Sequence, residues 1–213
     1  MRTAILSLTI ILFTRVAFAG DNPYLEAMQK NIQTVYTSHD LVALQAAANA
    51  FERIGSAEKN KWEPFYYESF GYVMMSIQAT ENKEKDNFLD QAEISVKKAK
   101  SIASEESEIV ALEGFVQMMR MNVDPASRGQ QYSGIVSTLL KKAIDLNGDN
   151  PRALSLMAQM QYGTAKFFNS STADACAMVS KSIEKFGTFK SDNPLGPQWG
   201  KGMAEKLKGK CEQ

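Results

Sequence analysis

The tripeptide Asp-Asn-Pro occurs three times in this chain of 213 residues, beginning at Asp21, Asp149 and Asp192. The second and third copies lie 43 residues apart, and the first and second lie 128 apart, close to three such steps. Asn is a strong N-cap, and Pro is favoured at the first helical position because its missing N–H would be unpaired there anyway. The tripeptide is therefore a helix-start signal, and its spacing predicts a repeat of about 43 residues.

Small residues follow the same spacing. Gly71, Gly114 and Ala158 lie 43 and 44 residues apart, each in the middle of an expected helix, and a second amphipathic stretch follows each first one. Two helices approach closely only where side chains are short, so these residues can accept the apolar row of a second helix. Because one hairpin cannot bury its own apolar face, we expect neighbouring hairpins to stack into a continuous core.

These recurrences predict an all-α fold: a solenoid of about four helical hairpins followed by a C-terminal capping helix. A chain of this length suffices for one sizeable core or one short array of repeats. Few segments alternate between apolar and polar residues with period two, so almost no strand is expected. The expected hairpins cover roughly residues 23–54, 61–102, 104–147 and 150–186, and the last helix covers roughly residues 197–210.

Residues 1–19 carry the pattern of a secretory signal peptide. A basic residue, an apolar run over residues 4–13 and the small-x-small pattern of Ala17 and Ala19 follow one another. As a helix, the apolar run spans about 15 Å, roughly half of a hydrocarbon core, so a membrane anchor is the less favoured alternative. We therefore expect an exported, periplasmic protein in which residues 20–213 form the repeat domain and no segment of the mature chain spans a membrane.

The charge balance argues against a polyanionic partner. The chain has 24 basic and 24 acidic residues, and the expected signal peptide contains two of the arginines. No basic stripe with interleaved aromatic residues occurs, so nucleic acid is not an expected partner.

Two cysteines, Cys176 and Cys211, occur in a chain that is expected to fold in an oxidising compartment. An even number of cysteines in such a chain favours a disulfide. The bond would close a loop of about 35 residues and stabilise the fold by about 4 kcal/mol on the loop-entropy model. The alternative is a buried Cys176 and an unpaired Cys211.

The stretch LLKKAIDLNGDNPRALSLMAQ resembles the junction between two tetratricopeptide (TPR) repeats. The FGYVMM stretch is similar to the core of a first TPR helix, with Phe70, Gly71 and Met74 in the corresponding roles. The usual repeat has 34 residues, and the resemblance puts the excess here into inserts between the helices of a hairpin: TENKEKDN, NVDPASRGQQY and NSSTAD. The junction residues that fit the pattern are Ala143, Ile144, Leu146, Asn150, Ala153 and Ala158.

More closely, the chain resembles a group of small secreted TPR-like proteins of Gram-negative bacteria. The similarity extends over nearly the whole expected mature chain and implies architecture and compartment rather than a mechanism. The stretches that carry it are Asn22–Tyr24, Phe51–Tyr67, Asp124–Tyr132 and Pro197–Gly200, together with Cys211.

The sequence offers little that could perform catalysis. The single histidine, His39, lies in a polar turn before an expected helix, and one His with two distant Cys cannot supply a zinc site. No phosphate-binding loop, nucleophile elbow or calcium loop occurs. We therefore expect no enzyme activity, no metal and no cofactor.

Arg128 lies in the second of the inserts, in an expected loop between helices. Its guanidinium offers a rigid fork of donors for a carboxylate or phosphate of a partner. The more ordinary interpretation is that Arg128 pairs with a neighbouring acidic residue.

The TPR resemblance implies a concave groove formed by the first helices, where partner peptides often bind. In the implied register this groove is rich in aromatic residues and Met, which suits adaptable apolar contacts. The alternative is that these stripes belong to the core. The implied groove residues are Phe65, Glu68, Tyr72 and Met75; then Glu108, Ala111, Phe115 and Met118; then Arg152, Ser155, Gln159 and Tyr162.

Two functional hypotheses follow. The first is a non-catalytic periplasmic interaction module that binds a protein or peptide segment in the groove. The second is a structural or assembly subunit of an envelope complex that uses its outer surface. An exposed apolar patch in the groove would favour the first, whereas a filled groove with an apolar patch elsewhere would favour the second.

Overall fold

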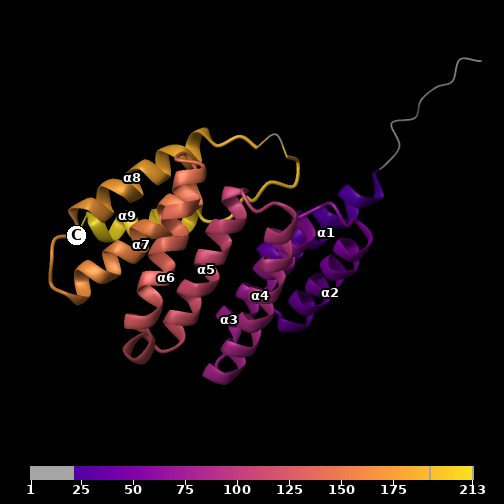
Figure 1. Ribbon diagram of the computed structural model, residues 1–213, viewed down its shortest axis with the longest axis horizontal. Coiled ribbons are helices and arrows are strands. Elements are labelled where there is room, and N and C mark those ends of the chain that lie inside the picture. Colours follow the sequence, from indigo (N-terminus) through magenta and orange to yellow (C-terminus); the bar gives the residue numbers. More distant parts are fainter. Residues whose placement is uncertain (1–21, 192, 213) are drawn as a thin grey trace, which may run out of the picture.

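The computed structural model describes residues 22–191 and 193–212, so the expected signal peptide lies outside the described residues. All regular structure in this part of the chain is helical (Figure 1), which confirms the all-α prediction. The helices are α1 (Pro23–Thr37), α2 (Leu41–Ala57), α3 (Glu63–Gln78), α4 (Asn82–Ile102), α5 (Ser107–Val123), α6 (Pro125–Leu146), α7 (Pro151–Phe167), α8 (Ala173–Thr188) and α9 (Lys201–Cys211).

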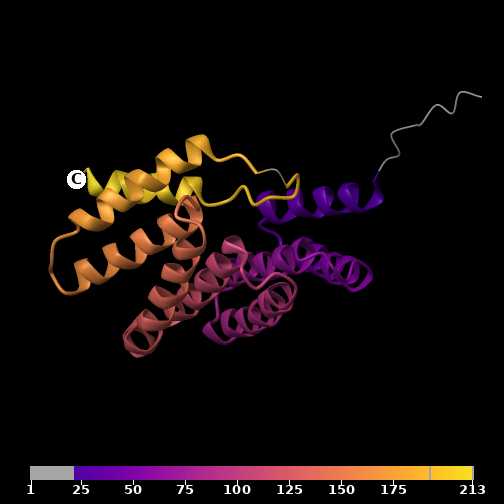
Figure 2. The same ribbon diagram turned by 45° about the horizontal axis from the view of Figure 1, so that its top comes forward.

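The helices form four hairpins, α1/α2, α3/α4, α5/α6 and α7/α8, which follow one another along the molecule (Figures 1 and 2). The recurring small residues let them pack closely. A Cβ on Gly114 would lie 2.7 Å from Leu140 Cδ2 of α6, and one on Gly71 would lie 3.4 Å from Val35 Cγ1 of α1. The TPR-like stacking that was predicted from the sequence is therefore confirmed, with close contacts both within and between hairpins.

Two of the three Asp-Asn-Pro copies begin helices as predicted. Asn22 accepts hydrogen bonds from the Tyr24 and Leu25 amides at the start of α1, and Asn150 caps α7 in the same way. In the third copy Asn193 begins a turn instead, and its Oδ1 accepts from the Leu195 amide. The side-chain chemistry is the same, but Pro197 shortly afterwards prevents a helix from continuing.

Two of the three expected inserts are not loops. The stretch that contains Arg128 forms the first turns of α6, because Asp124 accepts a hydrogen bond from the Ser127 amide and Pro125 occupies the first helical position. Most of the first insert likewise belongs to α4, which begins at Asn82. The extra length relative to a usual TPR therefore lengthens the second helices, and only the third insert remains a turn, between α7 and α8.

The C-terminal helix packs on the last hairpin, where Ala158, Val179, Ala204 and Leu207 form a buried apolar cluster. The Cys176–Cys211 disulfide, with an S–S distance of 2.02 Å, ties the end of α9 to the first turn of α8. This pairing confirms the disulfide that the sequence favoured. Among the described residues, no helix combines the length and the apolar character that a membrane crossing requires.

Candidate functional site

The groove between the first helices is partly occupied by the chain itself. After α8, residues 189–191 and 193–200, here called the groove loop, extend toward α1 and return to α9 (Figures 1 and 2). The loop contacts α1, α3, α5 and α7, and we call the side of these helices that it contacts the groove face.

Trp199 is the main apolar anchor of the groove loop. Its ring stacks between Phe70 of α3 and Phe115 of α5, with centroid distances of 5.2 Å to each. Its indole N–H donates a 2.8 Å hydrogen bond to the Tyr66 hydroxyl. In this region the aromatic side chains of the groove face are therefore covered by Trp199 of the same chain.

Tyrosine hydroxyls hold the backbone of the groove loop. Tyr67 donates to the Leu195 carbonyl at 2.7 Å, and the Gln198 amide donates to the Tyr36 hydroxyl at 3.0 Å. Burial raises the pKa of Tyr67, which keeps its hydroxyl protonated and able to donate. This half of the groove thus binds a loop of its own chain.

A buried ion pair closes the same region at α7. Arg152 is 1 % exposed; its Nη1 lies 3.2 Å from Glu108 Oε1, and its guanidinium lies 4.6 Å from the Phe189 ring centroid. Burial raises the pKa of Glu108 to about 7, although the positive charge of Arg152 acts in the opposite direction. Because a cation is attracted to the face of an aromatic ring, Arg152 holds Phe189 in place, and with it the start of the groove loop.

The groove residues expected in α3 do not lie on the groove face. Phe65 covers Gly55 of α2, Glu68 lies 4.0 Å from Lys98 of α4, and Tyr72 and Met75 are buried. The Tyr72 hydroxyl also accepts a hydrogen bond from Gln45 of α2, and Met75 shares this face by helical spacing, so all four side chains point toward the layer of second helices. The groove face of α3 instead follows Phe70, two positions before the implied Tyr72, and a shift of two residues turns a helix face by about 200°.

The residues expected in α5 and α7 divide into three groups. Phe115 and Arg152 lie on the groove face and are covered by the groove loop, with Glu108 buried in the ion pair with Arg152, while Ala111, Met118 and Ser155 are buried. Gln159 and Tyr162 are half-buried further along α7. The groove is thus not the continuous open surface that the sequence implied, because Trp199 and its neighbours fill part of it.

Beyond the groove loop the groove face stays open. Ile77 lies seven residues after Phe70 and Met119 lies four after Phe115, so both continue the same helix faces. They line a cleft of about 170 Å³ between α3 and α5, with Leu89 of α4 as its buried floor. The cleft is completed by Ser76, Lys85, Asn122 and Val123.

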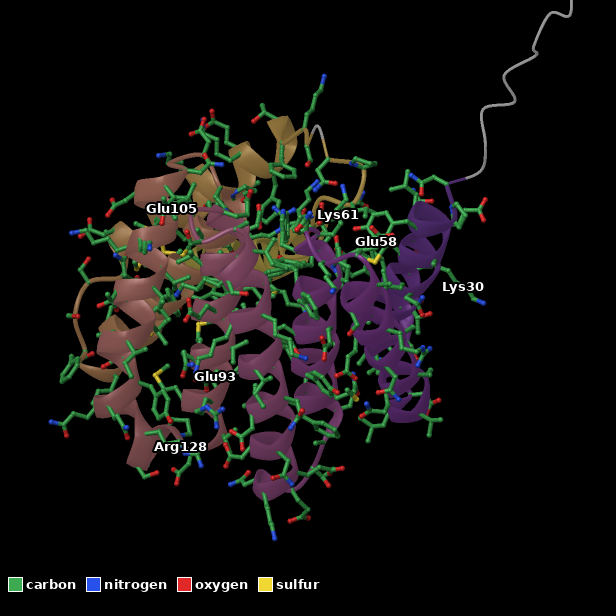
Figure 3. All side chains as sticks on the ribbon, turned by 45° about the vertical axis from the view of Figure 1, so that its right-hand side comes forward. Lys30, Glu58, Lys61, Glu93, Glu105 and Arg128 are labelled. Atoms are coloured by element: carbon green, nitrogen blue, oxygen red, sulfur yellow. A yellow bond between two sulfur atoms is a disulfide. The ribbon has the colours of Figure 1, made fainter. Side chains whose placement is uncertain are left out.

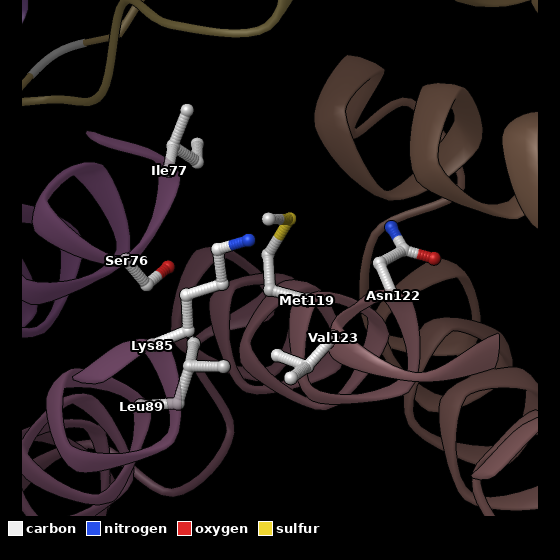
Figure 4. Close-up of a pocket in the computed structure, with 7 residues that line it drawn as sticks. All are labelled: Ser76, Ile77, Lys85, Leu89, Met119, Asn122 and Val123. Carbon is white, nitrogen blue, oxygen red and sulfur yellow. The ribbon is translucent and has the colours of Figure 1, made fainter. Parts of the chain in front are cut away.

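The cleft combines apolar walls with one cation. Figure 4 shows the Lys85 side chain extending toward the Met119 thioether, with Asn122 on the opposite side. Ile77 is 48 % exposed, so a molecule in the cleft would cover an aliphatic side chain. None of these residues was predicted from the sequence as a site residue. Once the register of α3 is known, Ile77 can be found because it lies seven residues, or two helical turns, after Phe70.

A second cleft, of about 180 Å³, lies between α1 and the tip of the groove loop. Three glutamine side chains contribute to its lining, so it is less apolar than the cleft at Ile77. Its wall includes the loop itself, which makes it part of the filled half of the groove.

Arg128 forms an ion pair. Its two terminal nitrogens contact the two carboxylate oxygens of Asp86 at 2.6 and 2.7 Å, and these hydrogen bonds hold the pKa of Asp86 below its usual value. Arg120, on α5, contacts Asp90 and Glu93 nearby (Figure 3 labels Arg128 and Glu93). This network joins α4, α5 and α6, so the donor fork of Arg128 is already engaged.

Possible metal ligands are not clustered in the part of the chain that the structure describes. In residues 22–191 and 193–212, no cluster of three or more His, Cys, Asp or Glu side chains is arranged to hold a metal ion. His39 is exposed, and its Nδ1 lies 3.0 Å from the Gln78 side-chain amide. The open cleft offers apolar surface, the Met119 thioether, the Lys85 amine and the polar side chains of Ser76 and Asn122.

The fold and the groove define a TPR-like helical repeat protein. A thermophilic TPR protein from Thermus thermophilus is similar in fold, with a TM-score of 0.58 at 17 % identity over 74 % of this chain and 73 % of that chain. The HusA haemophore from Porphyromonas gingivalis is similar with a TM-score of 0.79 at 26 % identity, over 90 % of this chain and 94 % of that chain. No protein-family model matches the chain, and neither does any curated protein.

Proposed function

We propose that this chain is a non-catalytic, exported binding protein whose open half of the groove receives a flat apolar ligand with carboxylates, of the haem type. The observation that carries the proposal is the cleft at Ile77 and Met119, which lies on the groove face and is left uncovered by the groove loop.

The chemistry of the cleft suits such a ligand. Apolar side chains can cover a ring edge, the Lys85 amine can pair with a carboxylate, and a methionine thioether is one of the side chains that ligate haem iron. A volume of about 170 Å³ is smaller than the ~300–1,000 Å³ of pockets that enclose a whole small ligand. The cleft would therefore hold one part of the ligand and leave the rest accessible for transfer.

The comparison and the disulfide support the same function. The HusA haemophore, whose name describes a haem carrier, matches this chain over nearly the full length of both proteins. The Cys176–Cys211 bond is typical of proteins that fold in an oxidising compartment, which supports export.

Titration of the protein with haemin, followed by the shift of the haemin absorbance band, tests this proposal. We expect saturable binding that Ile77→Glu weakens about tenfold or more, because a carboxylate would be buried in the cleft and would repel the ligand's own carboxylates. Ile94→Glu is the matched control, since Ile94 lies on α4 and is 49 % exposed against 48 % for Ile77.

A second pair of measurements distinguishes binding through the haem iron from binding through the porphyrin ring. Met119→Leu should weaken binding of haemin but not of iron-free protoporphyrin if the thioether ligates the iron, because Leu keeps the apolar volume. Absence of saturable haemin binding, or equal binding by the Ile77→Glu and Ile94→Glu variants, would reject a haem-type ligand in this cleft.

A protein or peptide segment is the second candidate for the open half. It is favoured by the way in which the adjacent half already holds a loop of the chain through Trp199 and tyrosine hydroxyls. Capture of an exported protein that Ile77→Glu abolishes and Ile94→Glu preserves, without haemin binding, would support this candidate over the first.

A further inference from the structure

The open cleft contains a soft metal ligand without any of the harder ones. Met119 lines the cleft from α5, and the Lys85 side chain extends toward its thioether (Figure 4). The other described residues that line the cleft are apolar or carry a neutral hydroxyl or amide, and none of them is a histidine, a cysteine or a carboxylate. An iron atom in this cleft would therefore have the thioether as its soft ligand.

The cleft also offers no negative charge. Lys85 is the one ionisable side chain among the described residues that line it. Acidic residues follow Lys85 on α4, but arginines already hold them: Asp86 contacts Arg128 at 2.6 Å, and Asp90 contacts Arg120 at 2.8 Å. A cationic group in the cleft would therefore lack a carboxylate to balance its charge.

These two features distinguish the oxidation states of haem iron. In a porphyrin ring, iron(III) leaves a net positive charge at the metal, whereas iron(II) leaves none. Moving a charge out of water is costly unless it is paired, so a cleft without carboxylates favours the neutral iron(II) form. Thioethers are soft ligands, and a methionine on haem iron raises its reduction potential, which also favours iron(II).

We propose that the open cleft holds haem more tightly with iron(II) than with iron(III), so that the oxidation state of the cargo controls its retention and release. This inference rests on the proposed function. Reduction adds one electron to the iron from an external one-electron donor, and the protein itself is neither oxidised nor reduced. The apolar contacts of the ring with Ile77 and Val123 are the same in both states, so the difference comes from Met119 and from the charge of the iron.

Titrations under nitrogen with haemin and with dithionite-reduced haemin give the two dissociation constants. We expect the value for iron(II) to be lower by about tenfold or more, and we expect Met119→Leu to remove most of this ratio while keeping the apolar volume. A tenfold change in the ratio corresponds to about 59 mV in the reduction potential of the bound haem. Spectroelectrochemistry of the loaded protein should therefore show a potential about 59 mV lower in Met119→Leu than in the wild type.

Met121→Leu is the matched control. Met119 and Met121 are both partly buried on α5, but only Met119 lines the cleft. Met121→Leu should therefore keep both the ratio of dissociation constants and the potential of the wild type.

The outcomes separate this inference from the proposed function. Equal dissociation constants for the two oxidation states, or tighter binding of iron(III), would overturn the inference and leave haem binding in place. A preference for iron(II) that Met119→Leu retains, or that Met121→Leu loses to the same extent, would overturn it as well. If haemin, reduced haemin and iron-free protoporphyrin all fail to bind, the proposed function is rejected and the inference with it.

Discussion

The filled and open halves of the groove face are built from the same helices but differ in what covers them. In the filled half, Phe70 and Phe115 contact Trp199, and tyrosine hydroxyls bind the loop backbone. One or two turns further along α3 and α5, Ile77 and Met119 line a cleft that the loop does not reach. Both halves are apolar stripes at helical spacing.

The difference lies in a segment that is distant in sequence. Trp199 reaches the ring of Phe70, which is 129 positions earlier, only because the chain turns back after α8. Aromatic residues on a TPR-like groove are therefore core or binding surface according to whether such a segment covers them. The following experiments test this distinction, from the largest expected effect to the smallest.

Removal of the central anchor should have the largest effect. Trp199→Ala would leave a cavity between Phe70 and Phe115 and an unpaired Tyr66 hydroxyl, at a cost of about 3–5 kcal/mol in the free energy of unfolding. Urea denaturation measures this loss, and Gln198→Ala, at an exposed neighbour, serves as control. A loss below about 1 kcal/mol would show that the loop does not act as part of the core.

The disulfide should contribute nearly as much. Cys176→Ser/Cys211→Ser opens a loop of about 35 residues that contains α8, the groove loop and α9, and should lower the free energy of unfolding by about 2–4 kcal/mol. Hydrogen exchange should then increase first at α9 and the groove loop and much less at α1 and α2. Uniform loss of protection across all hairpins would contradict a local role of the bond.

The buried ion pair predicts a pH dependence of the filled half. The pKa of Glu108 is about 7 in the folded protein, above its value in the unfolded chain. The folded state therefore binds the proton more tightly, and this contribution to stability is complete below the unfolded pKa and is lost as pH rises through about 7. Its size is on the order of 1–3 kcal/mol.

Denaturation of the wild type and of Glu108→Gln between pH 5 and 8 measures this contribution. The difference in unfolding free energy between the two should change with pH, with the wild type relatively more stable at the acidic end. Glu81→Gln, at an exposed carboxylate outside the groove, is the control. A difference that stays constant across the range would show that Glu108 does not titrate there.

The stability of the fold should be sensitive to a methyl group added at Gly200, the last residue of the groove loop. Gly200 has φ of 102°, and a Cβ there would lie 3.0 Å from Phe186 Cζ, so Gly200→Ala should cost about 1–3 kcal/mol. Gly202→Ala is an informative control, because Gly202 is helical with open space around it and the substitution should stabilise the fold by up to about 1 kcal/mol. Calorimetric melting shows whether the two substitutions have opposite signs.

Shortening a side chain in the open half of the groove should change the free energy of unfolding only slightly. Ile77→Ala removes a side chain that is already 48 % exposed and should cost less than about 1 kcal/mol, against the several expected for Trp199→Ala. Urea denaturation of both variants gives the comparison directly. A large loss for Ile77→Ala would mean that the cleft residue belongs to the core.

The sequence was sufficient for the architecture because the signals are local. Asn22 and Asn150 cap helices by bonding amides two and three residues away, and Gly114 marks where a neighbouring helix approaches. The pairing of Cys176 with Cys211 was favoured by their even number and by the oxidising compartment that the sequence predicts. The caps and the helix-packing positions can be predicted because helix capping and helix periodicity involve residues that are close together in the sequence.

The site depended on information that is not local. Whether Phe115 and Arg152 are open or covered depends on the groove loop, and the register of α3 differed from the implied one by two positions. A two-residue error leaves the helix itself unchanged but places the expected groove residues on its opposite face. The sequence thus determined that helical hairpins stack and where they begin, whereas only the tertiary structure decided which half of their shared groove remains free, because burial is settled by segments that meet in space.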